Sequence, residues 1–142
     1  MGALGWEIMR SDSLVIVRGV GIFDLPFIFA YRHAMETQGA VSYRKLFDLH
    51  QSDILLSAED LQSIADGAHT HASTAGPVAI VIGREPPPML VDMAILLKHR
   101  MGASRRFRLF TEEAEARQWL ASEPISPPVA RIPPKMLPVA KR

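Results

Sequence analysis

The feature that most constrains the fold of this chain is an uninterrupted apolar run, Pro77 to Gly83, with the sequence PVAIVIG. Most of its residues are Val or Ile, whose β-branched side chains favour strands. Because no polar residue alternates with them, the run is typical of a strand covered by helices on one or both faces. The sequence therefore predicts a central strand, and other elements must cover it.

Strand-like and helix-like patterns alternate around this run. The order predicted is β-β-α-β-α-β-α-β-α, which indicates an α/β protein with right-handed crossovers. The sheet is expected to be largely parallel behind an antiparallel N-terminal hairpin, since Ser11 to Ser13 split two short apolar runs with turn-forming residues. The other strands are expected at 43–48, 77–83 and 105–110, and the helices at 24–38, from 57, at 89–101 and from 111.

Local signals mark the ends and inner faces of the helices. Asp24, Ser57 and Thr111 are the expected N-caps, because their side-chain oxygens can accept a hydrogen bond from a free helix N–H. Gly39 and Gly102 are expected to end helices. The buried face of the first helix is predicted to consist of Leu25, Ile28, Phe29 and Met35.

The chain of 142 residues suits one hydrophobic core. We expect one domain over residues 1–122 and a Pro-rich tail over 123–142, in which six of twenty residues are proline. The tail also carries six apolar side chains, so we expect it to dock on its own domain or in a homodimer; a solvated linker is the competing interpretation. These side chains are Ile125, Val129, Ile132, Met136, Leu137 and Val139.

Composition removes several functional classes. The chain lacks cysteine, which excludes thiolate metal sites, disulfides and thiol catalysis. A net charge of +1 gives little global attraction to nucleic acid, and the basic run at 98–108 has no accompanying aromatic stacking motif. The N-terminus lacks a signal-peptide pattern, and no apolar stretch reaches the roughly 18 residues of a membrane span. We therefore expect a cytoplasmic protein without nucleic-acid partners.

Several segments between residues 6 and 121 together resemble the STAS-like domains of the SpoIIAA-like type, also described as STAS/SEC14-like proteins of bacteria. They are the N-terminal hairpin, YRKLFD at 43–48, LSAEDL at 56–61, GPVAIVIG at 76–83, and RRFRLF followed by TEEAEARQWL at 105–120. The resemblance implies a SpoIIAA-like STAS fold, with a four- or five-stranded mixed sheet and about four helices. It also implies action by binding rather than by catalysis.

In the anti-anti-sigma branch of these proteins, a phosphorylated serine opens the helix after the third strand, and Ser57 resembles its positional counterpart. That branch typically carries an Asp-Ser-Ser-Gly motif there, whereas this chain has Leu55-Leu56-Ser57-Ala58. Ser57 with Asp60 instead fits the S-x-x-[D/E] capping arrangement. We therefore expect Ser57 to cap the helix rather than to be phosphorylated.

The candidate binding residues are Asp48, His50, Ser57 and Arg84, expected near the carboxyl ends of the parallel strands, where open α/β sheets usually bind ligands. The first hypothesis is a non-enzymatic module that binds a protein partner or a small apolar or anionic ligand there. The second is an enzyme with Asp48 and His50 as acid and base. The third is a self-assembling structural domain.

No motif for a bound cofactor is present in the sequence. The five histidines do not follow a metal-ligand spacing, and no G-x-S-x-G elbow occurs. Gly19-Val-Gly21 lacks the third glycine of a dinucleotide loop and is expected to form a tight turn. We therefore expect no metal and no cofactor.

Overall fold

The computed structural model describes residues 4–70, 76–101 and 106–123. These ranges do not include the predicted helix end at Gly102, His71 or the tail beyond residue 123. The strands are β1 (Gly5–Met9), β2 (Leu14–Arg18), β3 (Gly21–Asp24), β4 (Arg44–Asp48), β5 (Ser52–Leu55), β6 (Val78–Val81) and β7 (Phe107–Phe110). The helices are α1 (Leu25–Thr37), α2 (Ala58–Thr70), α3 (Pro88–Met101) and α4 (Glu113–Ser122), with a 3-10 turn η1 (Arg10–Asp12) between β1 and β2.

The main sheet has five strands in the order β1-β2-β4-β6-β7. β1 pairs antiparallel with β2, while β4, β6 and β7 continue the sheet in parallel. The predicted mixed α/β sheet behind an N-terminal hairpin is therefore confirmed. β6 lies between β4 and β7, with Phe47 opposite Ile80 and Ile80 opposite Leu109. Both faces of the sheet are covered, which explains why β6 is continuously apolar.

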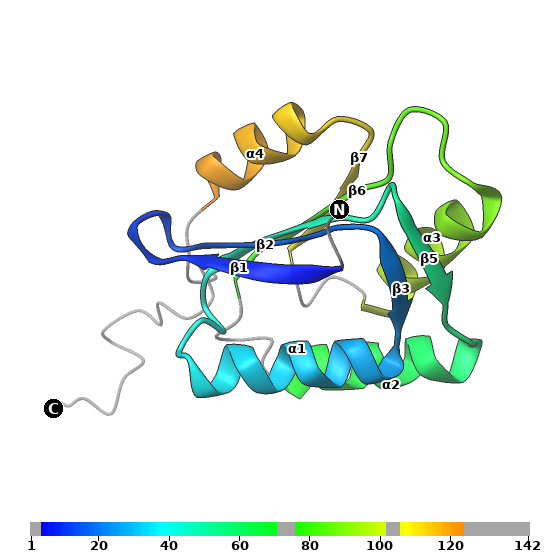
Figure 1. Cartoon of the computed structure of the whole chain (residues 1–142), viewed down its shortest axis with the longest axis horizontal. Helices are drawn as coiled ribbons and strands as arrows, with labels where there is room; N and C mark the ends of the chain where they lie inside the picture. The colour runs from blue at the N-terminus through cyan, green and yellow to red at the C-terminus, as the bar shows by residue number, and fades with distance from the viewer. Residues whose placement is uncertain (1–3, 71–75, 102–105, 124–142) are drawn as a thin grey trace, which may run out of the picture.

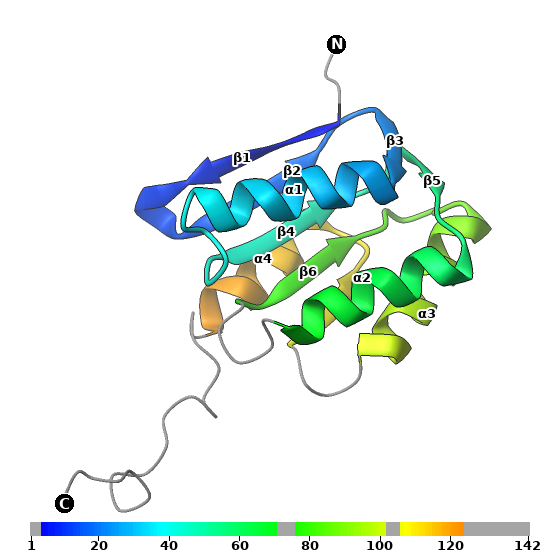
Figure 2. The same cartoon turned by 90° about the horizontal axis from the view of Figure 1, so that it is seen from below.

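Helices form a layer on each face of the sheet, as Figure 1 shows. One face packs on α4 through a small cluster that includes Leu46, Ala79 and Leu120. The opposite face carries the larger core, where Val15, Phe47 and Ile80 are buried beneath α1, α2 and α3. In Figure 2, which views this face directly, α1 and α2 run side by side in front of the sheet. Because side chains alternate along a strand, neighbouring residues of β4 and β6 belong to different layers.

The first helix begins and ends where its local signals predict. Asp24 is the N-cap of α1, and its Oδ1 accepts a hydrogen bond from the Phe27 amide at 3.0 Å. Gly39 adopts a φ of 70° just after the helix. The amides of Gly39 and Ala40 donate to the carbonyls of Glu36 and Met35, which is a Schellman ending.

The structure differs from the predicted elements in three places. Phe29 is 52% exposed, and Tyr31 takes its predicted place in the core, because β3 and the sheet meet the Ile28–Met35 side of α1. Thr111 is not a cap: Glu112 occupies the N-cap position of α4 without a side-chain hydrogen bond. A two-stranded parallel sheet of β3 and β5 was not predicted, and its β3 begins at Gly21.

Candidate functional site

Two of the four predicted binding residues lie together at the carboxyl end of β4. Asp48 is buried, and its Oδ1 lies 2.5 Å from Nδ1 of His50, whose ring is partly exposed. The same Oδ1 accepts a longer hydrogen bond from the His50 amide, at 3.4 Å. Gly83, with a φ of 86°, lies against this turn, because an added Cβ would come within 3.1 Å of the His50 Cβ. Asp48 therefore stabilises the turn after β4 and fixes the imidazole.

Arg84 forms an ion pair with Glu112 and not with Asp48. Its Nε donates to Oε2 of Glu112, and its side chain is 80% exposed. This hydrogen bond, followed by the charge of Glu112, raises the pKa of Arg84 above the ordinary value. Arg84 thus ties the loop after β6 to the start of α4, and its described contacts do not include the Asp48–His50 pair.

Ser57 occupies the N-cap position before α2 and forms a reciprocal capping box. Its Oγ accepts a hydrogen bond from the Asp60 amide at 3.0 Å, while Oδ2 of Asp60 accepts one from the Ser57 amide at 3.0 Å. Two amides that a helix N-terminus would leave without partners are thereby satisfied. The capping role expected from the sequence accounts for both contacts.

Ser57→Ala is expected to lower the free energy of unfolding by about 1 kcal/mol, because it removes the hydroxyl that accepts from Asp60. Ser57→Asp should cost much less, since a carboxylate accepts the same bond and suits the positive end of the helix. Urea denaturation measures both changes. Ser63→Ala, at an exposed position within α2, is the matched control and should be nearly neutral. Equal midpoints for wild type and Ser57→Ala would contradict the capping role.

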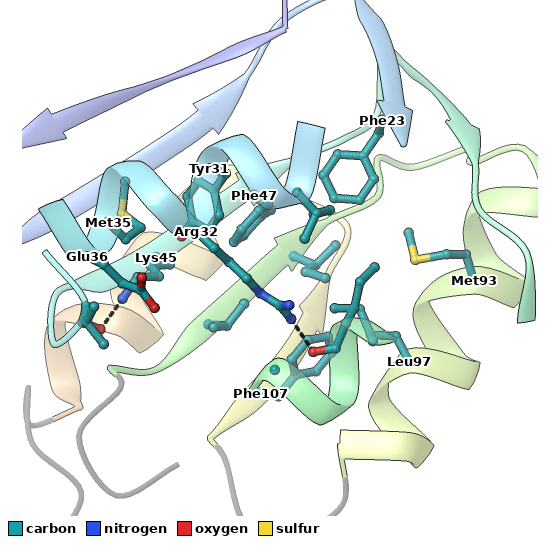
Figure 3. Close-up of a pocket in the computed structure, with 16 residues that line it drawn as sticks. Phe23, Tyr31, Arg32, Met35, Glu36, Lys45, Phe47, Met93, Leu97 and Phe107 are labelled. Atoms are coloured by element: carbon teal, nitrogen blue, oxygen red, sulfur yellow. Dashed lines mark hydrogen bonds between the residues drawn. The ribbon is translucent and has the colours of Figure 1, made fainter. Parts of the chain in front are cut away.

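A cavity of about 110 Å³, which the sequence analysis did not predict, lies between the main sheet and α1, α2 and α3 (Figure 3). Its walls are mostly apolar, and three charged side chains also line it. The apolar lining includes Phe23, Phe47, Met93, Leu97 and Phe107, and the charged residues are Arg32, Glu36 and Lys45. For comparison, an engineered apolar cavity of roughly 150 Å³ binds benzene. The space is therefore of the right order for a small organic group.

Strand alternation places the sheet residues that line the cavity. In β4, Lys45 and Phe47 face it, while Leu46 between them packs toward α4. Lys45 is only 4% exposed, and its Nζ donates to the carbonyls of Val41 and Tyr43 at 2.5 and 2.7 Å. Backbone oxygens of the turn before β4 thus compensate part of the cost of burying this ammonium group.

Arg32 crosses from α1 to α2 along one side of the cavity (Figure 3). Its Nη2 donates to the main-chain carbonyl of Ile64. Its guanidinium lies directly over Gly67, where an added Cβ would overlap it. Burial lowers the pKa of Arg32, against the opposing attraction of Tyr31 and Glu36, but an arginine keeps its charge at neutral pH.

The sequence contains signals that mark this cavity. Arg32 stands four residues after Ile28 and three before Met35, so a charged residue interrupts the inward stripe of a helix. Lys45 interrupts an apolar strand in the same way, and Gly67 interrupts α2. Charged or helix-weakening residues at inward positions are the features that distinguish a lined cavity from ordinary core.

A five-stranded mixed sheet with an N-terminal hairpin and helices on both faces is the SpoIIAA-like fold of STAS-like domains. The structure is similar to an uncharacterised DUF3478-family protein with a SpoIIAA-like fold from Shewanella loihica PV-4, with a TM-score of 0.55 and 18% identity over 82% of this chain and 91% of that one. It is also similar to the anti-sigma factor antagonist SpoIIAA in its unphosphorylated form, with a TM-score of 0.53 and 16% identity over 84% and 98%. No family model matches the sequence, and a search of the curated proteins by sequence found no match.

Two further observations concern the described ranges only. No three His, Asp or Glu side chains gather there as ligands for a metal ion. No helix among these residues is long and apolar enough to cross a membrane.

Proposed function

We propose that this chain is a non-enzymatic binding module whose cavity between the main sheet and α1, α2 and α3 holds a small, largely apolar ligand. The observation that carries the proposal is the cavity itself. Protein interiors are normally packed with few voids larger than a water molecule. The cavity is partly open, so its mostly apolar walls are in contact with solvent instead of packed side chains. A ligand that fills it would remove this apolar surface from water.

Two other features support binding rather than catalysis. SpoIIAA, whose fold this chain shares, is described as an anti-sigma factor antagonist, a role exerted through another protein. The Asp48–His50 pair, on which the enzyme hypothesis rests, lines neither this cavity nor the shallow groove between β7 and α4. Among the described residues, the pair therefore faces neither of these two hollows.

Benzene and toluene, which each contain one aromatic ring, are expected to bind in the cavity and to shift the methyl NMR signals of Met35 and Met93, which line it. The Met89 methyl should not respond, because this residue is 62% exposed at the start of α3. Ile64→Phe and Leu97→Phe place an aromatic ring into the space and should abolish the shifts; overpacking of this kind costs typically 1–3 kcal/mol. A thermal melt identifies the variant that remains folded.

Failure of every apolar probe to shift Met35 and Met93 would contradict the proposal. The second candidate, binding of a protein partner, would then have the better support. It rests on the outer face of the β3–β5 sheet, where Val20, Ile22 and Leu55 are all more than half exposed. Exposed apolar side chains clustered on one face are a feature of protein interaction sites.

A further inference from the structure

We propose that the ligand of this cavity is a small monocarboxylic acid, with its apolar body between the sheet and the helices and its carboxylate on Arg32. This inference rests on the proposed function and adds the chemical class of the ligand. Three observations carry it: the charges that line the cavity, the hydrogen bond that Arg32 makes, and the glycine beneath its guanidinium.

The charged lining favours an anion over a neutral or cationic ligand. Arg32 and Lys45 are cations and Glu36 is the one carboxylate among the described lining residues, which leaves one positive charge in excess. In partly buried surroundings such an excess attracts an anion far more strongly than it would in bulk water. An entering carboxylate would balance the lining, whereas an ammonium group would add to the excess.

Arg32, rather than Lys45, is the residue suited to bind the acid. Lys45 is buried and already donates to two backbone carbonyls. The guanidinium of Arg32 has five N–H donors, and one of them donates to a neutral carbonyl, that of Ile64. A carboxylate is a stronger acceptor and can take two parallel hydrogen bonds from the guanidinium fork. Arg32 is also only partly buried, so part of its side chain remains accessible to solvent.

Gly67 provides the space in which the guanidinium lies. A glycine inside a helix is less favourable than alanine by about 1 kcal/mol, and Gly67 stands within α2. A Cβ at this position would overlap the guanidinium of Arg32. Glycine thus stands at the point of α2 where any larger residue would displace the guanidinium from its present place between α1 and α2. We infer that Gly67 is a positioning residue for Arg32.

The cavity volume sets the size of the ligand. At about 110 Å³ it is smaller than the roughly 150 Å³ cavity that accepts benzene. The apolar body should therefore be no larger than about one aromatic ring or a short alkyl chain. Benzoate and hexanoate fit this description, and long-chain acids exceed it.

The test compares each acid with its neutral amide of nearly the same shape: benzoate with benzamide, and hexanoate with hexanamide. Titrations at pH 7 follow the methyl signals of Met35 and Met93, with Met89 as the internal control. In the wild-type protein the acids should bind about tenfold more tightly than the amides, or better, because they gain charge-assisted hydrogen bonds. This preference should weaken as salt is added.

Three variants test whether the preference for acids over amides depends on Arg32. Arg32→Met keeps much of the apolar stem and should lower acid affinity to that of the amide, with amide affinity unchanged. Arg32→Lys keeps the charge without the fork and should give an intermediate value. Gly67→Ala keeps the arginine but displaces its guanidinium, so it should weaken acid binding several-fold and leave amide binding intact. Melting temperatures show which variants remain folded.

The outcomes separate this inference from the proposed function. Equal affinity of benzoate and benzamide in the wild type would overturn the acid inference and leave the apolar binding module standing. An acid preference that survives in Arg32→Met would overturn the role of Arg32. If neither acids, amides nor apolar probes shift Met35 and Met93, both the inference and the proposed function are wrong.

Discussion

Ile80→Ala is expected to lower the free energy of unfolding by about 2–5 kcal/mol, one of the two largest effects predicted for this chain. Ile80 is 3% exposed at the centre of β6, and it pairs with β4 on one side and β7 on the other. Both neighbouring strands hold the backbone, so the site cannot collapse to fill the space. The deleted methyl groups also enlarge a cavity that Ile80 already lines. Urea denaturation with a two-state fit measures the change.

Ile95→Ala is the matched control, because it deletes the same atoms from a side chain that is 56% exposed on α3. Its effect should stay within about 0.5 kcal/mol of the wild type. A near-neutral Ile80→Ala would mean that β6 is not the covered central strand. Addition of benzene should restore part of the stability lost in Ile80→Ala, since binding to the folded state alone stabilises it.

The elements predicted well from the sequence are those whose cause is local. The apolar run of β6 indicates a strand covered on one or both faces wherever it lies, and Asp24 and Ser57 cap helices through residues three positions away. Gly39 ends α1 through its own backbone conformation. Each of these interactions spans only a few residues, so a short stretch of sequence contains every residue that takes part in it.

The elements that the sequence did not predict depend on distant partners. β3 and β5 have four residues each, and their pairing joins segments about thirty positions apart, so neither shows a clear strand pattern alone. Phe29 fits a helical stripe as well as Tyr31 does, and only the position of the sheet decides which one is buried. Tertiary packing therefore determines which of the two side chains is buried.

The same distinction applies to the candidate site. Asp48 and His50 are two residues apart and meet as the sequence suggests, whereas Arg84 pairs with Glu112, 28 positions away. The cavity combines residues from three helices and four strands, and no single segment predicts its volume. Charged residues at inward positions can nevertheless be recognised in the sequence, and Arg32 and Lys45 are both of this kind.

The likeness of this chain to SpoIIAA concerns its fold, and its capping serine follows a different motif from the one expected of that branch. In this structure both described contacts of Ser57 serve the helix end, so they give no reason to expect a phosphorylation switch. The features of this chain that support a binding role are the cavity and the Arg32–Gly67 arrangement beside it. A common fold can support different binding functions, so the role has to be argued from such local features.

Gly76→Ala is expected to destabilise the protein by about 1–3 kcal/mol or more, the second of the two large effects. Gly76 is buried just before β6, and its amide donates to the carbonyl of Val41 at 3.2 Å. An added Cβ would overlap the carbonyl oxygens of Ser42 and Tyr43. These are backbone atoms of the turn before β4, so they cannot rotate away as a side chain would. The clash must move one strand relative to the other.

The displacement should also reach the cavity, because the Tyr43 carbonyl that the methyl group would strike accepts a hydrogen bond from the buried Lys45 ammonium group. Urea denaturation measures the stability, and the methyl NMR signal of Met35 reports on the cavity. Gly5→Ala is the control, since a Cβ there has no atom within 4 Å, and it should unfold near the wild-type midpoint. If Gly76→Ala matched that control, the close packing of Gly76 on the turn would be wrong. A loss of stability with an unchanged Met35 signal would instead mean that the structural change is limited to the ends of the strands and does not reach the Lys45 side of the cavity.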